Sequence, residues 1–272
     1  MIRGHRPSIR MASLVVVLGI GGGSVPVVLP GDSQGATPVW TSPGLDQAQQ
    51  VAELRRLGGT VFERDGAVVE VNLNRTRVED RDLDGLAGFT AMTDLSLEET
   101  AIGDDGLRRL AGLKSLVWLN LYRTRVGDDG LSHLGGLVRL EHLPLGETRV
   151  TDAGLVHLGR LRRLTYLGLV GDRITDAGLQ HLSRLTSLTG LNLGRTEISD
   201  RGVAQLRPLV RLKKLWLNDT HVTDAAVTGL AGLDALEDLY VFRTDMTIAG
   251  VRELKRLRPE CRIYFRSDRE PD

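Results

Sequence analysis

The same pattern of apolar and polar residues repeats along the chain at a constant spacing. The distance in sequence from Thr100 to Thr124 is one such repeat. Residues 116–139 show one such unit. Leu119 and Leu121 alternate with aromatic and polar side chains, which predicts a short strand with one buried face. Leu131 follows, with further leucines at intervals of three positions, which predicts a helix with one apolar side. Such a unit cannot bury its leucines alone, so we expect successive units to stack on one another.

Two polar columns keep the same spacing. The first consists of Thr76, Thr100, Thr124, Thr148, Thr196, Thr220 and Thr244, with Asp172 once in this place. The second consists of Asp80, Asp104, Asp128, Asp152, Asp176, Asp200 and Asp224, and Ile248 takes this place at the end. We expect each threonine hydroxyl to bond to backbone in a turn. We expect each aspartate to be the N-cap of its helix, because a carboxylate there accepts from the free N–H groups of the first turn.

The order L-x-x-L-x-L-x-x-T-x-[VI]-x-D-x-G-L-x-x-L-x-x-L resembles the leucine-rich repeat family over residues 68–265. The resemblance is best to 24-residue bacterial repeats similar to the F-box-associated and ribonuclease-inhibitor-like class. Threonine stands here where asparagine often forms the family's ladder. The resemblance implies an α/β solenoid of about eight repeats, shaped as a curved horseshoe. Its parallel β-sheet would line the concave side and its helices the convex side.

The two ends of the repeat array are predicted to be capped. Ser42 and Pro43 would begin a helix, because proline is tolerated in the first turn. A turn at Asp65 and Gly66 separates two apolar runs and predicts a hairpin that leads into the first repeat strand. We therefore divide the chain into an N-terminal cap at 37–66, a repeat domain with a C-terminal cap strand at 67–266, and a tail at 267–272. Cys261 lies in the last strand region and is expected to be a small buried filler.

The first 36 residues have a different composition. Arg3, Arg6 and Arg10 come without an acid, and an apolar stretch follows at residues 11–29. A basic segment before an apolar one is typical of a secretory signal peptide. An uncleaved membrane anchor needs about 20 residues, and the same stretch is close to that length, although glycines and a proline interrupt it. Both alternatives for residues 1–36 predict an exported domain, whether periplasmic, in the cell envelope or secreted.

Charge and cysteine content exclude several classes of function. The chain has 35 Lys and Arg and 35 Asp and Glu, so a formal net charge of zero gives no case for nucleic-acid binding. A single cysteine builds neither a disulfide framework nor a cysteine zinc site. His133, His157 and His181 recur on successive helices. Such helices pack about 8–10 Å apart, whereas zinc ligands lie ~2 Å from the ion. We expect no metal and no cofactor.

Two features concern the sheet itself. A row of mostly alternating charge runs along one edge of the predicted sheet: Arg75, Glu99, Arg123, Glu147, Gly171, Arg195, Asp219 and Arg243. Neighbouring strands would pair opposite signs, so this row predicts a ladder of surface ion pairs that supports strand register. Pro144 stands within a strand and has no N–H to donate, which predicts a local weak point in the sheet.

Aromatic residues concentrate in the strand positions that alternate with the buried leucines. The chain has 3 Trp, 4 Tyr and 4 Phe, and seven of these eleven stand in such positions. We expect two patches, with Trp118 near Tyr166 across His142 and with Trp216 beside Tyr240. A low strip of glycines and Pro144 would separate them. The candidate ligand-binding residues of the concave face are Trp118, Tyr122, His142, Tyr166, Trp216, Asn218, Tyr240 and Phe242.

Several functions fit this pattern. Tryptophan and tyrosine anchor many interfaces, which favours a non-enzymatic protein-binding module. The aromatics could instead stack on sugar rings in a carbohydrate- or envelope-binding protein, or simply stiffen an exposed sheet. A substrate-recognition subunit resembling F-box leucine-rich repeat proteins is a third alternative. No set of nucleophile, base and acid is brought together by the predicted fold, so we expect no enzyme.

Overall fold

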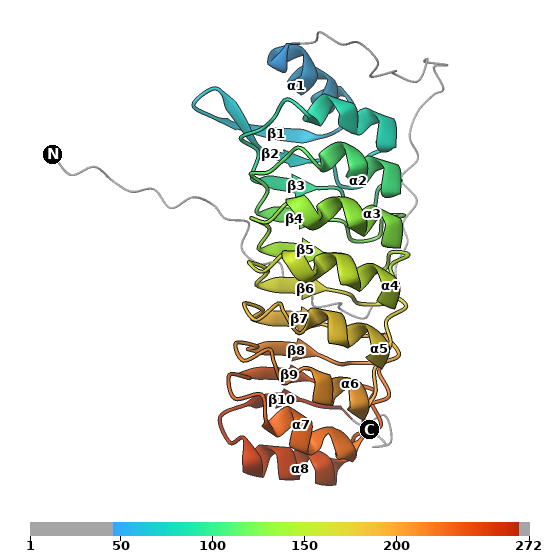
Figure 1. The fold of residues 1–272 in the computed structure, drawn as a ribbon, viewed down its shortest axis with the longest axis vertical. Helices are drawn as coiled ribbons and strands as arrows, with labels where there is room; N and C mark the ends of the chain where they lie inside the picture. The colour runs from blue at the N-terminus through green and yellow to red at the C-terminus, as the bar shows by residue number, and fades with distance from the viewer. Residues whose placement is uncertain (1–45, 267–272) are drawn as a thin grey trace, which may run out of the picture. The chain divides into compact units, whose positions relative to one another are not determined.

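Residues 46–266 are described by a computed structural model, in which the strands form one ten-stranded sheet in the order of the chain (Figure 1). The first strand is antiparallel to the second, and from the second strand onward all neighbours are parallel. The strands are β1 (Thr60–Arg64), β2 (Ala67–Asn72), β3 (Asp94–Ser96), β4 (Trp118–Asn120), β5 (His142–Pro144), β6 (Tyr166–Gly168), β7 (Gly190–Asn192), β8 (Lys214–Trp216), β9 (Asp238–Tyr240) and β10 (Arg262–Tyr264).

Helical segments connect the parallel strands. The α-helices are α1 (Gln47–Arg56), α2 (Asp104–Leu110), α3 (Asp128–Ser132), α4 (Asp152–Leu155), α5 (Asp176–Leu179), α6 (Asp200–Gln205), α7 (Val227–Ala231) and α8 (Ile248–Leu257). The 3-10 helices are η1 (Asp80–Leu86), η2 (His133–Gly136), η3 (Val156–Arg160), η4 (Gln180–Leu182) and η5 (Asp224–Ala226). Most helical segments are short because each repeat unit is itself short and must also complete a strand, a turn and a return.

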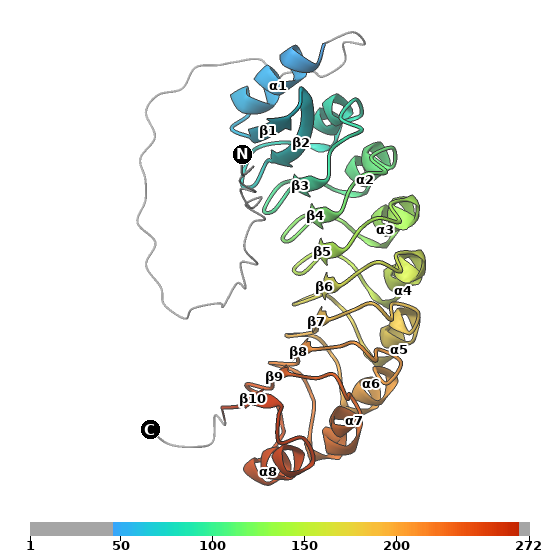
Figure 2. The same cartoon turned by 90° about the vertical axis from the view of Figure 1, so that its left-hand side faces the viewer.

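The described residues form two layers, with strands on the concave side and helices on the convex side (Figure 2). The apolar columns fill the space between the layers. Leu119, Leu121 and Leu143, for example, are 0% exposed. Along most of the parallel sheet, each strand residue is in register with its equivalent one repeat unit away, as Leu119 is with Leu95, so equivalent positions lie side by side. The predicted fold class is therefore confirmed.

The threonine column closes the turn after each strand. Thr124 Oγ1 donates to the Leu121 carbonyl at 2.7 Å. The same hydrogen bond is made by Thr76, Thr100, Thr196, Thr220 and Thr244. Thr148 is different, because its hydroxyl and its N–H both donate to Asp172 Oδ1, at 2.9 and 2.7 Å. The one departure in this column therefore changes the bonding of its neighbour as well.

The prediction that the aspartates are helix N-caps is wrong. The N-cap is the preceding residue, and Thr151, for instance, accepts from Ala153 N–H at 3.3 Å. Each aspartate is instead joined to the next coil. Asp128 accepts from the N–H of Thr151 at 2.8 Å and from its hydroxyl at 2.6 Å. Gly154 leaves room for this contact, because a Cβ there would collide with Asp128 Oδ1.

The same bond to the next coil is made by Asp80, Asp104, Asp152, Asp176, Asp200 and Asp224. The column ends at Ile248, and this ending has a physical reason. After α8 the chain enters β10, and no further helix N-cap follows within residues 46–266. A carboxylate at position 248 would therefore have no N-cap N–H of a following coil to accept from within residues 46–266.

At the N-terminal end, α1 and the hairpin of β1 and β2 precede the first parallel pair. The predicted helix start at Ser42 and Pro43 is not where α1 begins; both residues lie outside the described range. Asp46 is the N-cap, accepting from Gln49 N–H at 2.8 Å, while the Gln49 side chain accepts from Asp46 N–H at 3.0 Å. This reciprocal pair is a capping box.

Pro144 shortens the pairing of β4 with β5 to one register pair, Trp118 with His142, where the other parallel pairs have three. The sheet continues nonetheless, because Leu121 N–H donates to the Pro144 carbonyl at 2.9 Å. Arg123 N–H donates to the Gly146 carbonyl at the same distance. The missing donor therefore loosens the sheet at one point without interrupting it.

Cys261 is 1% exposed, and burial raises the pKa of its thiol. Within residues 46–266 none of the helices has the length and apolar character that a bilayer crossing requires. The predicted signal peptide or anchor at 1–36 and the tail at 267–272 lie outside the described residues.

Candidate functional site

Five aromatic rings on the concave sheet form a connected cluster, which we call the aromatic run: Tyr166, Trp216, Tyr240, Phe242 and Tyr264. Trp216 and Tyr240 stack with centroids 5.2 Å apart and planes at 8°. Tyr240 and Tyr264 stack at 4.4 Å and 5°. Tyr166 meets Trp216 edge-on at 6.3 Å, and Phe242 lies 6.2 Å from Tyr240. Aromatic pairs at these separations attract one another beyond their shared burial.

Strand register explains most of the aromatic run. Trp216 is paired with Tyr240, and Tyr240 with Tyr264, on adjacent parallel strands. Tyr166 stands two residues earlier in its coil and reaches Trp216 across the intervening strand. A Cβ on Gly190 would lie 3.0 Å from the Tyr166 ring, and a Cβ on Gly168 would lie 3.2 Å from its hydroxyl. These two glycines therefore provide the space that the ring occupies.

The prediction of two separate patches is wrong. Tyr166 lies over part of the glycine strip that was expected to divide them, and it joins the C-terminal patch. His142 stacks on Tyr166 at 6.4 Å and extends the cluster by one strand. Trp118 is half-buried on the same face but has no ring contact with another described aromatic residue. Together with His142, the aromatic run thus extends over the sheet from β5 to β10.

The rings of Trp216, Tyr240 and Tyr264 lie side by side, each facing the next from a neighbouring strand. Tyr240 has Trp216 against one face and Tyr264 against the other. Both faces of the Tyr240 ring are therefore covered within the protein, and its edge remains for the concave space. Burial, followed by the charge of Asp238, raises the pKa of Tyr240, and burial raises that of Tyr166. Both hydroxyls therefore remain protonated hydrogen-bond donors at neutral pH.

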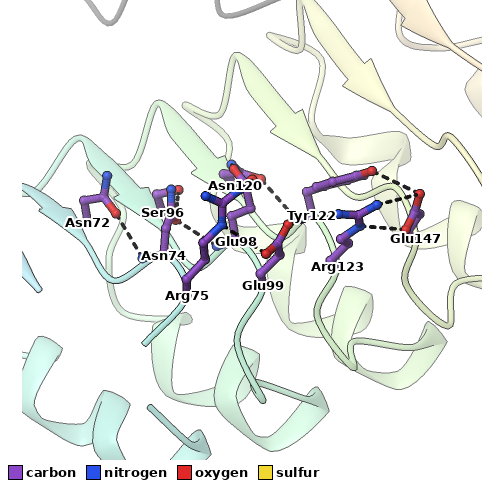
Figure 3. Close-up of polar contacts among 10 residues, drawn as sticks. All are labelled: Asn72, Asn74, Arg75, Ser96, Glu98, Glu99, Asn120, Tyr122, Arg123 and Glu147. Atoms are coloured by element: carbon purple, nitrogen blue, oxygen red, sulfur yellow. Dashed lines mark hydrogen bonds and ion pairs between the residues drawn. The ribbon is translucent and has the colours of Figure 1, made fainter. Parts of the chain in front are cut away.

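Tyr122 belongs to a different network at the sheet edge (Figure 3). Its hydroxyl donates to Glu147 Oε1 at 3.1 Å, and the Arg123 guanidinium lies 5.1 Å from its ring centre. Burial and then the charge of Glu147 raise the pKa of Tyr122 to about 12. Its polar atom is thus already engaged by the protein itself.

The charged row of the sheet edge forms the expected ladder. Arg123 pairs with Glu99 at 3.0 Å and with Glu147 at 2.7 Å. Gly171 takes the charged place in the coil between those of Glu147 and Arg195. Arg195 therefore extends past this coil and pairs with Glu147 at 2.7 Å. Arg75 pairs with Glu99 and Arg243 with Asp219 in the same way. Although burial opposes it, hydrogen bonds from the two arginines and Tyr122 lower the pKa of Glu147.

A polar cluster on β2 to β4 was not singled out by the sequence (Figure 3). Ser96 Oγ and Glu98 N–H donate to Asn74 Oδ1 at 2.5 and 2.9 Å. Asn120 Nδ2 donates to Glu98 Oε2 at 3.0 Å, while its Oδ1 accepts from the N–H of Tyr122. The available signal was an asparagine close to the end of the strand, where its side chain can accept from the backbone.

Charge differs between the two ends of the concave face. Glu70 and Asp94 are register neighbours on β2 and β3. Burial and then the charge of Asp94 raise the pKa of Glu70. At the other end Asp238 is paired with Arg262 at 2.6 Å and with Lys214 at 3.5 Å.

Two other expectations concern Asn218 and metals. Asn218 Nδ2 donates to Asp219 Oδ2 at 3.1 Å, and its side chain fills the space above Gly194. It therefore borders the aromatic run without joining it. Among residues 46–266 no group of three or more His, Cys, Asp or Glu is arranged to hold a metal ion.

No model of a known protein family and no curated protein matches this sequence. Solved structures do match. An internalin (inlF) from Listeria monocytogenes has a TM-score of 0.61 and 27% identity, covering 74% of this chain and 54% of that chain. Internalin C2 (inlC2) of the same species has a TM-score of 0.51 and 25% identity, covering 67% of this chain and 82% of that chain.

A third similar structure is the leucine-rich repeat ectodomain of the Arabidopsis receptor kinase HAESA, in complex with an N-terminally extended IDA peptide hormone. Its TM-score is 0.59 at 20% identity, covering 82% of this chain and 39% of that chain. The present chain thus spans about half the length of the inlF structure. Fold, repeat pattern and these likenesses together define a leucine-rich repeat protein.

Proposed function

We propose that this protein is a non-enzymatic binding module that holds a protein partner on its concave face, at the aromatic run. The observation that carries the proposal is the placement of Trp216 and Tyr240. They lie half-buried on the sheet surface, while the core between the layers is filled by aliphatic side chains. Large aromatic side chains with polar atoms are the usual anchors of protein interfaces.

The arrangement of the rings favours a protein over a glycan. A sugar ring stacks on a free aromatic face, but both faces of Tyr240 are covered by neighbouring rings. Tyr240 therefore offers its ring edge and hydroxyl, which suits a peptide with mixed apolar and polar groups. The HAESA structure holds a peptide hormone, and this agrees with a peptide segment as the occupant of the present face.

The charges at the two ends suggest how the partner lies. Glu70 and Asp94 favour a basic group over β2 and β3, since neither carboxylate forms an ion pair with a described residue. Arg262 and Lys214 surround a single aspartate near β8 to β10 and favour an acidic group there. The partner would be met outside the cytoplasm if residues 1–36 direct export, as the sequence predicts.

The test is affinity capture from cell extract with the full chain, followed by mass spectrometry. Trp216→Ala combined with Tyr240→Ala should abolish capture of the specific partner. The matched control is Phe62→Ala, which removes another exposed aromatic ring from strand β1. Each lost ring contact destabilises the fold by about 0.5–1.5 kcal/mol, so circular dichroism should still show a folded chain. Undiminished capture by the double variant would reject the site, and binding to a glycan array alone would favour the carbohydrate alternative.

A further inference from the structure

A second surface, on the sheet edge where the strands begin, carries a concentrated positive charge. The turns that lead into β5, β6, β7 and β8 comprise residues 135–141, 159–165, 183–189 and 207–213. Together these turns hold eight Lys or Arg and one Asp or Glu. The eight turns at the opposite edge, residues 74–79 and their equivalents, hold eight basic and eight acidic residues. The net charge of zero therefore conceals a local surplus at one edge.

All eight basic side chains are exposed, and among them Lys213 pairs with Glu237 at 2.6 Å. The six that matter here, which we call the basic strip, are Arg139, Arg162, Arg163, Arg184, Arg207 and Arg211. All six are exposed, and none forms an ion pair or a side-chain hydrogen bond with another described residue. In the ladder of the opposite edge, by contrast, arginines alternate with carboxylates. An anionic partner that binds here would therefore reduce the repulsion among the arginines of the basic strip.

The strip is a row because every coil makes the same turn. Leu140, Leu164 and Leu212 each donate an N–H to the leucine carbonyl three residues earlier, at 3.0 Å. The strands that follow are in register. Arg139, Arg163 and Arg211 precede their strands by the same interval and so project from equivalent places. Neighbouring strands are about 4.8 Å apart, so the strip presents its charges at regular intervals along this edge.

Two exposed valines lie within this row. Val210 and Val138 are 67% and 53% exposed, and Val210 is the most exposed of the large apolar side chains in residues 46–266. They share one column with Arg162, directly beside the column of Arg139, Arg163 and Arg211. Basic side chains flanking protruding apolar ones are the combination that holds a protein at a lipid surface. A linear polyanion would use the arginines but gain nothing from the valines.

We propose that this edge docks on a membrane surface of anionic lipids, with the basic strip at the headgroups and Val138 and Val210 against the outer acyl chains. Contact through an edge of the sheet leaves the concave face open to the side. The aromatic run therefore remains accessible while the protein is held at the membrane. This inference does not rest on the proposed function of the aromatic run.

The test is co-sedimentation of the full chain with phosphatidylserine-rich vesicles and with pure phosphatidylcholine vesicles. The variant Arg162→Ser, Arg163→Ser, Arg211→Ser should lower partitioning onto the anionic vesicles about a hundredfold, since each basic side chain contributes about a fivefold factor. The matched control is Arg125→Ser, Arg149→Ser, Arg173→Ser, with the same charge change on exposed side chains of the opposite edge. The control should keep nearly full binding. Residues 1–45 are common to all these proteins and cannot cause a difference between them.

A second variant separates lipid from other polyanions. Val138→Ser with Val210→Ser should weaken vesicle binding several-fold and leave the weak binding of heparin or duplex DNA unchanged. The proposal is overturned if anionic and neutral vesicles bind equally, or if the control loses as much as the strip variant. It is also overturned if heparin or DNA depends on the strip while the valines have no effect on vesicles, because the ligand is then a linear polyanion.

Discussion

Replacing Asp172 by threonine should stabilise the protein, and the gain should grow with pH. Asp172 takes the threonine place of its coil and is 3% exposed. Its Oδ1 accepts two hydrogen bonds from Thr148, whereas its Oδ2 has no partner. Burial raises the pKa of this carboxyl from 3.8 to about 7, against the effect of the Thr148 hydrogen bonds. The folded chain therefore holds a proton at Asp172 that the unfolded chain releases more readily.

The sign and size follow from linkage. Because the folded state binds the proton more tightly, the free energy of unfolding falls as the pH rises from the unfolded pKa to the folded one. A difference of about 3 pKa units corresponds to about 4 kcal/mol at 1.36 kcal/mol per unit. This penalty is complete above about pH 7 and small near pH 4. Threonine cannot ionise, and its hydroxyl can donate to the Leu169 carbonyl as the other coils' threonines do.

The measurement is urea-induced unfolding of the wild type and Asp172→Thr at about pH 5 and about pH 8. We expect the variant's advantage to be larger at the higher pH by about 2 kcal/mol or more. Asp172→Asn is the control, since it removes the charge and keeps the shape. Other titrating groups contribute equally to both proteins and cancel in the difference. An advantage that is the same at both pH values would refute the reasoning.

Three further predictions concern the coil contacts, the aromatic run and the ladder. Asp152→Ala removes two bonds to Thr175 and should lower the free energy of unfolding by about 1.5–3 kcal/mol in urea titrations; an unchanged midpoint would contradict the inter-coil role. Gly190→Ala should displace the Tyr166 ring and weaken partner capture without unfolding the chain, as read by near-ultraviolet circular dichroism. Glu147→Gln should cost about 1 kcal/mol at low salt and less at high salt, and a salt-independent loss would argue against the charge pairing.

The sequence predicts the coil well because one leucine period determines both the strand face and the helix face. It misplaces the aspartate role, because threonine, serine and aspartate are all good N-caps. In α4, α5, α6 and η5 a threonine or serine stands directly before the aspartate. Only the structure shows that Thr151 caps its own helix while Asp128 serves the next coil. The aspartate bonds join residues of different repeat units, so the pattern within one unit does not predict them. The one sequence feature connected with them is the glycine that makes room for the carboxylate.

The candidate site is predicted less completely than the fold. The aromatic positions follow from the strand alternation, but the direction in which a ring leans does not. Tyr166 reaches Trp216 because Gly168 and Gly190 leave space for its ring. The sequence shows that these residues are small, but it does not show which side chain occupies the space. The burial of the Asp172 carboxyl is likewise hidden, since the residue type alone suggests a solvated turn. The basic strip is visible in the sequence only after the turns are aligned by coil.

The aspartate bond gives the array a direction. Each aspartate accepts from the backbone N–H of the following coil's N-cap residue, so the joints between interior coils share this bond. Excising or duplicating one whole repeat unit would bring matching halves of a joint together again. The span of the inner surface could thus be lengthened or shortened in whole steps, provided that the terminal segment carrying Ile248 stays last.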